Sequence, residues 1–254
     1  MLLSIDTEFE RRHTYRPILS IVQIKEEGKD AVIYDVLKKR DKNENNRYYE
    51  QADIRTGVED IQYLQYLLSN DDNIKIIHAC KQDMEAIYYH FNIVMKNIFD
   101  TQVAGKYLGF GNEIGYAKLV NLVCHKDIVK EKRLQHSNWL KRPLTGEQIV
   151  YAKQDVEFLQ PIYNELITMF NDDQTAYQQF QQECKKLEDE KYYKFNPALV
   201  WQRYKHKIGY TKNYQLIKQL FFEREKQAYR RNLPREFVCK FEDLVRFAKK
   251  NDDV

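Results

Sequence analysis

The order of strand-like and helix-like segments constrains the fold of this chain more than any other feature. Three segments with strand periodicity or short apolar runs come first, at residues 1–9, 18–24 and 31–36. Strands then alternate with helices, which predicts a helix at 58–68, a strand at 74–79, a helix at 81–91 and a strand at 98–101. This order predicts an α/β fold with a mixed sheet flanked by helices.

The rest of the chain is predicted to be mainly helical. A helix is expected near 117–124, and one long helix runs from Thr145, a candidate N-cap, to about Phe170. The polar segment 38–57 is typical of a loop. From residue 196 on, the pattern predicts only helices, at 197–206, 213–231 and 241–250. We therefore divide the chain into an α/β domain at 1–171, a helical linker at 172–195 and a small all-α region at 196–254.

Charge is distributed unevenly along the chain. Residues 191–250 hold 16 Lys and Arg against 5 Asp and Glu, whereas the rest of the chain holds 25 against 33. An acidic body with a basic C-terminal region favours a polyanionic partner, nucleic acid first and an anionic surface second. A solvated helical face is the alternative explanation of the same charges.

Composition narrows the class of protein. The chain is 43% hydrophobic and 31% charged, which excludes a disordered chain, and no apolar run approaches the ~18 residues of a membrane span. An acid already at Asp6 is too early for a signal peptide. The four cysteines are scattered, which favours free thiols over disulfides or a zinc site. We therefore expect a soluble cytoplasmic protein.

Four acids and a tyrosine carry the chemical signal. Asp6 and Glu8 are two residues apart in a predicted strand, so both side chains project from one face. Tyr151 and Asp155 are four residues apart on one face of a predicted helix, and Asp83 lies in the first turn of another helix.

Each of these acids has a structural explanation when it is considered alone. Asp-x-Glu is common on surface strands, Asp155 is explained as an exposed acid beside a core tyrosine, and Asp83 complements a helix dipole. Together, however, four acids at one end of a sheet would hold two divalent cations about 3.5–4 Å apart, the arrangement that hydrolyses phosphodiesters. Adjacent carboxylates repel unless a cation lies between them, and Mg²⁺ prefers oxygen ligands.

The order of the motifs resembles ribonuclease D. The motifs are D-T-E-F from Asp6, H-A-x-x-x-D from His78, D-T-Q from Asp100, R-P-L-T from Arg142 and Y-x-x-x-D from Tyr151. Connecting segments match as well, and the similarity runs from Asp6 to about Leu166. Ribonuclease D belongs to the DEDD group of 3′→5′ exonucleases, so the resemblance implies an RNase H-like fold.

The resemblance also implies roles for single residues. Asp6, Glu8, Asp83 and Asp155 correspond to the metal ligands, with Asp6 bridging both ions and Asp83 holding one through water. Tyr151 matches the tyrosine that orients the attacking water in the tyrosine subgroup. The implied cofactors are two divalent ions, Mg²⁺ first and Mn²⁺ as the alternative, and Asp100 caps a helix. Weaker candidates for substrate contacts are Thr7, Gln23, His78, Lys132, Arg133 and Arg142.

The C-terminal region has a resemblance of its own. Residues 220–249 are similar to the start of the helicase-and-RNase-D C-terminal (HRDC) domain, of which only part is expected here. Its basic run is expected to bind phosphates without reading bases, and comprises Arg224, Lys226, Arg230, Arg231 and Arg235.

Three functional hypotheses follow. The first is a metal-dependent 3′→5′ exoribonuclease that acts on tRNA precursors or other structured RNA ends. The second is an exonuclease of single-stranded DNA, and the third is a catalytically inactive RNA-binding relative. The complete set of acids and Tyr151 argue against the third, because uncompensated acids in a pocket are costly without metal. No membrane and no obligatory protein partner are expected.

Overall fold

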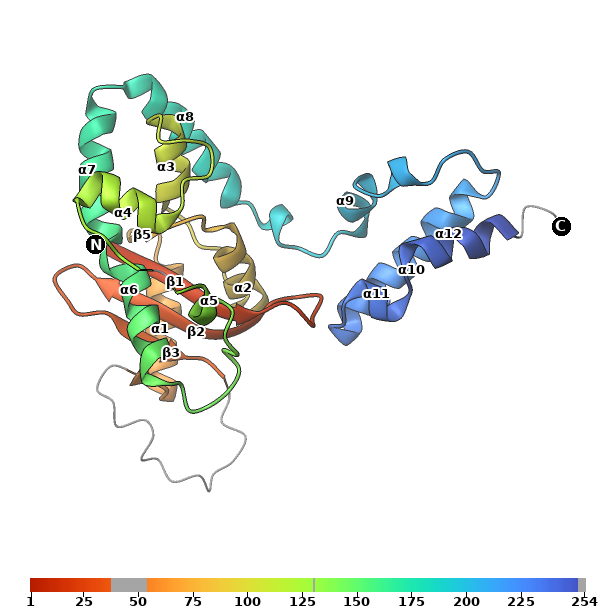
Figure 1. Cartoon of the computed structure of the whole chain (residues 1–254), viewed down its shortest axis with the longest axis horizontal. Coiled ribbons are helices and arrows are strands. Elements are labelled where there is room, and N and C mark those ends of the chain that lie inside the picture. Colours follow the sequence, from red (N-terminus) through yellow and green to blue (C-terminus); the bar gives the residue numbers. More distant parts are fainter. Residues whose placement is uncertain (38–53, 130, 251–254) are drawn as a thin grey trace. The chain divides into compact units, whose positions relative to one another are not determined.

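Six strands form one mixed sheet in the order β4-β3-β2-β1-β5-β6 (Figure 1). Strand β1 lies near the middle, antiparallel to β2 and parallel to β5, and its register with β2 shifts between Glu8 and Phe9. The mixed sheet predicted from the order of segments is confirmed. The strands are β1 (Leu2–Glu10), β2 (Ile18–Glu26), β3 (Val32–Asp35), β4 (Ile54–Arg55), β5 (Ile74–Ile77) and β6 (Ile98–Asp100).

Helices cover both faces of this sheet (Figure 1). Helices α1 (Val58–Ser69) and α2 (Lys81–Phe91) pack against the face that carries Leu3 and Ile5. Since side chains alternate along a strand, Asp6 and Glu8 project from the opposite face. That face is covered by α6 (Gly146–Glu157) and α7 (Leu159–Asn171). Around them lie α3 (Thr101–Tyr107), α4 (Tyr116–Cys124), α5 (Lys132–Gln135) and α8 (Gln174–Leu187).

The helix expected from Thr145 to about Phe170 is divided in two. Helix α6 ends at Glu157 and α7 starts at Leu159. At the junction, the Phe158 N–H donates to the hydroxyl of Tyr116 at 3.1 Å, so a side chain from α4 takes this donor. The prediction of one continuous helix is therefore wrong. The sequence around Phe158 does not indicate the break, because the partner of its N–H lies 42 residues away in the chain.

The structure, a computed structural model, describes residues 1–37, 54–129 and 131–250. Most of the predicted loop at 38–57 lies outside the described residues, but Ile54 and Arg55 pair with β3 as a short strand. Helix α8 falls in the segment predicted as a linker, and it buries Ala176, Phe180 and Cys184 in the core formed with α3, α4 and α7. A search of the described helices finds no segment long and apolar enough to span a membrane.

Two compact units make up the chain. Unit 1 comprises Met1–Glu10 and Ile18–Tyr193, which hold the sheet, and unit 2 comprises Arg11–Pro17 and Lys194–Val254. The helices of unit 2 pack around Trp201, Phe221 and Phe241. They are α9 (Pro197–Gln202), α10 (Tyr214–Arg231), α11 (Arg235–Val238) and α12 (Phe241–Lys250), with 3₁₀ turns at Lys205–Lys207 here and at Glu190–Tyr192 in unit 1.

Two arginines of the predicted phosphate-binding run contact one buried carboxylate of unit 2. Arg224 is 4% exposed, its Nη2 lies 2.8 Å from Oε1 of Glu225, and its guanidinium lies over the ring of Phe221. Arg235 Nε lies 3.2 Å from the same oxygen. The expectation that Arg224 binds phosphate is therefore wrong, because its guanidinium is buried against a fully buried carboxylate; for Arg235, whose side chain is 29% exposed, it stays a prediction. Arg230 and Arg231 remain exposed.

Candidate metal centre

Three carboxylates from two elements lie close together in unit 1. Asp6 and Glu8 project from β1 toward the layer of α6, and Asp155 comes from α6 itself. One carboxylate oxygen of each residue lies within 4.8 Å of the others. Negative charges at this separation repel one another, and a divalent cation with oxygen ligands would relieve that repulsion. The structure thus brings together three of the four acids predicted as metal ligands.

The start of α6 is fixed by its sequence. Thr145 Oγ1 accepts a hydrogen bond from the Gln148 N–H at 3.2 Å, and Gln148 Oε1 accepts one from the Thr145 N–H at 3.0 Å. This capping box satisfies two backbone donors and sets where the helix begins. The predicted N-cap at Thr145 is confirmed. One and two turns later, the helix presents Tyr151 and Asp155 on one face.

Tyr151 is a buried phenol beside the three acids. It is 5% exposed, and burial, followed by the charges of Asp155, Glu8 and Asp6, raises the pKa of its hydroxyl far above the usual value. A hydrogen bond to Asp155 acts in the same direction. A phenol with a raised pKa is a hydrogen-bond donor at neutral pH.

Asp83 approaches β1 from the other face of the sheet. It accepts a hydrogen bond from Thr7 Oγ1 at 2.5 Å, and Thr7 projects opposite to Asp6 and Glu8. Among the described residues, Asp83 is not part of the group whose oxygens lie within 4.8 Å. Burial raises the pKa of Asp83 to about 7. The structure therefore places this acid against the residue that follows Asp6 in the chain.

Asp100 supports the segment that leads to Asp83. Its carboxylate accepts the backbone N–H groups of Ala79 at 3.0 Å and Cys80 at 2.8 Å, where the chain enters α2. It also accepts from Gln102 and Val103 at the start of α3, so the predicted helix cap is confirmed. His78 lies in the same segment, with Nδ1 2.8 Å from Thr101 Oγ1.

Gln23 faces the acids from the neighbouring strand. It pairs with Asp6 across β1 and β2, and directly opposed residues of an antiparallel pair share a face. Its side chain is fully buried, and neither its amide oxygen nor its amide nitrogen has a hydrogen-bond partner in the described part of the chain. A buried amide with unmet hydrogen bonds beside hard oxygen donors fits a hydrated divalent ion. The residues present therefore fit the metal that the motifs imply.

The remaining candidates lie in or after the short helix α5. Lys132 is the first residue of α5 and is exposed. Arg133 forms ion pairs with Glu131 and Glu147 on the surface. Arg142, in contrast, makes all of its contacts inside the protein, with Asp35, Ser20 and carbonyl groups of its own loop.

Tyr116 is a residue of the site that the sequence patterns do not indicate. Its hydroxyl donates to the Gln154 carbonyl at 3.2 Å and accepts from the Phe158 N–H, so it holds the end of α6 just beyond Asp155. Burial, with the charges of Asp155 and Asp6, raises its pKa well above the usual value for a phenol. A lone tyrosine after a glycine is not a recognisable signal.

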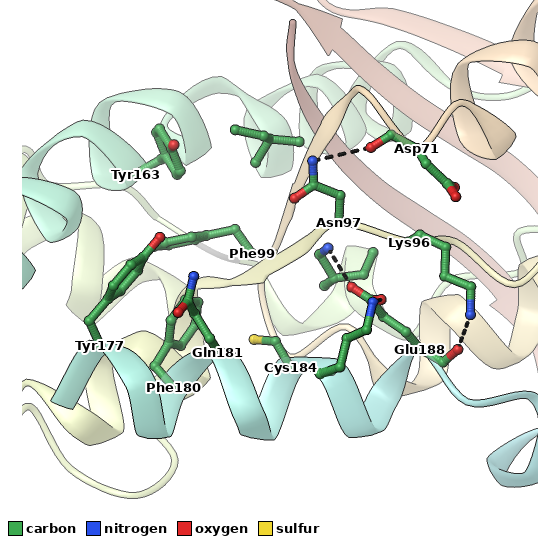
Figure 2. Close-up of a pocket in the computed structure, with 13 residues that line it drawn as sticks. Asp71, Lys96, Asn97, Phe99, Tyr163, Tyr177, Phe180, Gln181, Cys184 and Glu188 are labelled. Atoms are coloured by element: carbon green, nitrogen blue, oxygen red, sulfur yellow. Dashed lines mark hydrogen bonds and ion pairs between the residues drawn. The ribbon is translucent and has the colours of Figure 1, made fainter. Parts of the chain in front are cut away.

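Two cavities of unit 1 differ in what lines them. A cavity of about 390 Å³ lies between α5 and α6 and is bordered by Leu134, Val150 and Tyr151. A second cavity, of about 460 Å³, lies at the β6 edge of the sheet, where Phe99, Tyr163 and Tyr177 form one end (Figure 2). No predicted site residue lines the second cavity. Of these two cavities, only the first is lined by one of the four acids or Tyr151, namely Tyr151.

Comparison with known proteins identifies the family. Residues 2–171, the segment that contains all four acids and Tyr151, match the family model of the 3′-5′ exonuclease. The chain belongs to the 3′-5′ exonuclease family. It is 32% identical over 246 residues to ribonuclease D of Acidiphilium cryptum and 31% identical over 240 residues to ribonuclease D of Nitrobacter hamburgensis. The resemblance to ribonuclease D drawn from the motifs is thus confirmed.

These matches cover 97% and 94% of this chain but only 57% of each relative. The chain therefore spans little more than half the length of the curated relatives it matches.

Solved structures share the fold. RNase D of Escherichia coli, an exoribonuclease involved in structured RNA processing, superposes with a TM-score of 0.80 at 24% identity, over 98% of this chain and 60% of that one. NrnC of Brucella melitensis, solved with bound Mg²⁺, gives 0.57 at 21% identity, over 74% and 81%. The predicted α/β fold with a mixed sheet and a helical C-terminal region is confirmed.

Proposed function

We propose that this chain hydrolyses phosphodiester bonds stepwise from the 3′ end of RNA, with divalent metal ions as cofactors. The observation that carries the proposal is the meeting of Asp6, Glu8 and Asp155 within 4.8 Å, beside the buried phenol of Tyr151. Membership of the 3′-5′ exonuclease family supports the same reaction.

The proposed site residues have two roles: the acids hold the cations, and Tyr151 orients the nucleophile. Asp6, Glu8 and Asp155 would hold Mg²⁺, or Mn²⁺ in its place, and Asp83, hydrogen-bonded to Thr7 between Asp6 and Glu8, would contribute through water. Two ions bound in this way supply an activated water molecule and stabilise the leaving 3′ oxygen. Tyr151, protonated at neutral pH, would hydrogen-bond the attacking water and aim it at the phosphorus. Gln23 and the Thr7 backbone would contact the terminal nucleotide or its water shell.

RNA is the proposed substrate because the curated relatives are ribonucleases D. Structured RNA, including tRNA precursors, fits the RNA-processing role of the Escherichia coli neighbour and the exposed basic residues Arg230 and Arg231 of unit 2. Basic residues on helices contact phosphates without base selectivity, which suits an enzyme that trims ends of many sequences. Unit 2 is accordingly proposed to be a partial HRDC-like module.

The test uses RNA and DNA of one sequence, each labelled at the 5′ or at the 3′ end, with Mg²⁺ or with EDTA. The proposal expects 5′-labelled RNA to give a ladder of products shortened one nucleotide at a time, and 3′-labelled RNA to release labelled mononucleotide at once. EDTA should stop both. A hairpin with a 3′ trailer tests the preference for structured RNA.

Each alternative has its own result in this assay. A ladder from DNA without one from RNA would favour a DNA exonuclease, and retention of RNA without cleavage at any Mg²⁺ or Mn²⁺ concentration would favour an inactive RNA-binding relative. Either result contradicts the proposal.

A further inference from the structure

Arg142 fixes the loop that precedes α6. Its Nε and Nη2 donate to the two carboxylate oxygens of Asp35 at 2.5 and 2.8 Å, and its Nη1 donates to the carbonyls of Trp139 and Lys141 at 2.7 and 2.9 Å. Nη2 also donates to Ser20 Oγ at 2.9 Å. These contacts use all five N–H groups of the guanidinium, so none is left for a phosphate of the substrate.

The two residues that bind Arg142 through their side chains lie on the central sheet. Ser20 is on β2 and fully buried, and Asp35 is at the end of β3 and 5% exposed. Ser20 Oγ also donates to the Trp139 carbonyl at 2.5 Å. We refer to Arg142, Asp35 and Ser20 as the loop clamp. A two-pronged bond between a guanidinium and a carboxylate fixes orientation as well as distance.

The loop clamp connects to Tyr151 through Trp139. Trp139 is 3% exposed, and its ring centroid lies 6.1 Å from that of Tyr151. Both rings belong to a small core with Ile21, on β2, and Ile33, on β3. Strands β2 and β3, which hold Arg142, thus also contribute to the core around Tyr151, and the loop contributes Trp139 to it.

The proposed reaction depends on where the phenol of Tyr151 points. A phenol that orients the attacking water must point toward it, and a misplacement of about 1 Å can lower a rate about 10²-fold. A buried ion pair contributes little net stability compared with apolar packing, but it can specify a single arrangement. The two hydrogen bonds from Arg142 to Asp35 join the loop to the sheet, and they are suited to holding Trp139, and with it Tyr151, in one orientation.

We propose that the loop clamp positions Tyr151 for catalysis, and that Arg142 is a positioning residue rather than a phosphate contact. The inference rests on the proposed exonuclease function, because it concerns the orientation of the proposed water-orienting group. It replaces the expectation that Arg142 binds substrate, and it gives a role to Asp35 and Ser20, which no motif indicates.

A double-mutant cycle tests this coupling. Arg142→Gln is expected to lower kcat about 30- to 100-fold with KM within twofold, and Tyr151→Phe alone about 10²-fold. In the Tyr151→Phe background, Arg142→Gln should cost less than threefold, because there is no phenol left to misplace. Lys141→Gln, an exposed neighbour in the same loop, is the matched control and should leave kcat unchanged.

Two results would overturn the proposal. One is a full multiplicative loss in the double variant, which a merely structural defect predicts. The other is a rise in KM with unchanged kcat, which a phosphate contact predicts. If Arg142→Gln fails to fold, Arg142→Lys, which keeps the charge and loses the two-pronged geometry, runs the same cycle.

A second measurement does not depend on activity. The chain has two tryptophans, Trp139 and Trp201, so the protein labelled with 5-fluorotryptophan should give two ¹⁹F resonances. Arg142→Gln should shift the Trp139 resonance and leave that of Trp201, in unit 2, in place. An unchanged Trp139 resonance would contradict the loop clamp. Absence of hydrolysis by the wild type would instead contradict the proposed function, and the ¹⁹F result would still report on the clamp.

Discussion

Unit 1 and unit 2 place acids in opposite surroundings. In unit 1, the carboxylates of Asp6, Glu8 and Asp155 lie within 4.8 Å of one another. In unit 2, Glu225 is fully buried, with Arg224 Nη2 at 2.8 Å, Arg235 Nε at 3.2 Å and the Tyr15 hydroxyl at 2.8 Å. Like charges gather in one region, and opposite charges in the other.

The difference separates a site from a structural element. A buried carboxylate whose charge is balanced by arginines is complete, and its neighbours contribute to one stable arrangement. Carboxylates held side by side raise the energy of the folded chain until a cation joins them. The expected effects of mutation and of metal therefore differ between the two units.

The largest effect is expected from removing one acid of the metal centre. Asp155→Asn should lower the rate of RNA hydrolysis at least about 10³-fold. It removes a metal ligand, and bound metal ions stabilise the charged transition state by several kcal/mol. Single-turnover kinetics with end-labelled RNA measure this loss. Glu157→Gln, two residues further along α6 and 48% exposed in its ion pair with Lys25, is the control and should change the rate less than twofold. Wild-type rates for Asp155→Asn would contradict the site.

The corresponding change of an acid to its amide in unit 2 should lower the stability of the fold rather than the rate of hydrolysis. Glu225→Gln leaves the buried guanidinium of Arg224 and the partly exposed one of Arg235 without their counter-charge, so the free energy of unfolding should fall by about 3–5 kcal/mol. Differential scanning calorimetry would show this as an earlier transition. Glu223→Gln, whose ion pair with Lys226 is exposed, should cost below about 1 kcal/mol. Equal losses for the two variants would contradict the buried charge cluster.

Divalent metal should stabilise the folded chain through unit 1 alone. Mg²⁺ at 100 times its dissociation constant should add about 2.7 kcal/mol to the free energy of unfolding of the wild type. Glu225→Gln should gain the same increment, and Asp155→Asn should gain little. A gain that survives Asp155→Asn would place the ion elsewhere.

A further effect concerns the pH dependence of stability in the absence of metal. Burial raises the pKa of Asp83 to about 7, above its ordinary value near 4, so the folded chain retains a proton that the unfolded chain has lost. Stability from this group is complete below about pH 4 and is lost as pH rises toward 7. Asp83→Asn should flatten this part of the profile in urea unfolding with EDTA. If the wild type gained stability relative to Asp83→Asn between about pH 4 and pH 7, the predicted direction of this pH dependence would be contradicted.

Local patterns predicted much of the fold and part of the site. The two-residue alternation of β1 placed Asp6 and Glu8 on one face, and the spacing of Tyr151 and Asp155 placed both on one side of α6. These inferences succeed because strand and helix geometry is set by neighbouring residues.

The remaining features depend on partners distant in the chain. The break at Phe158 needs the hydroxyl of Tyr116, and the contacts of Arg142 depend on Asp35, 107 residues away. Arg224 resembles any other surface cation in the sequence until folding buries it beside Glu225. Asp83 follows a buried strand as expected, but the packing of α2 decides which face of β1 it reaches.

The central claim is that Asp6, Glu8 and Asp155 bind divalent metal, and anomalous diffraction tests it most directly. Crystals soaked in Mn²⁺ should give an anomalous difference peak between these three carboxylates, about 2.0–2.3 Å from oxygens of at least two of them. Crystals of Asp155→Asn under the same conditions should lose or greatly weaken that peak. A map with no peak there at saturating Mn²⁺, or with its strongest peak at another cluster, would contradict the account.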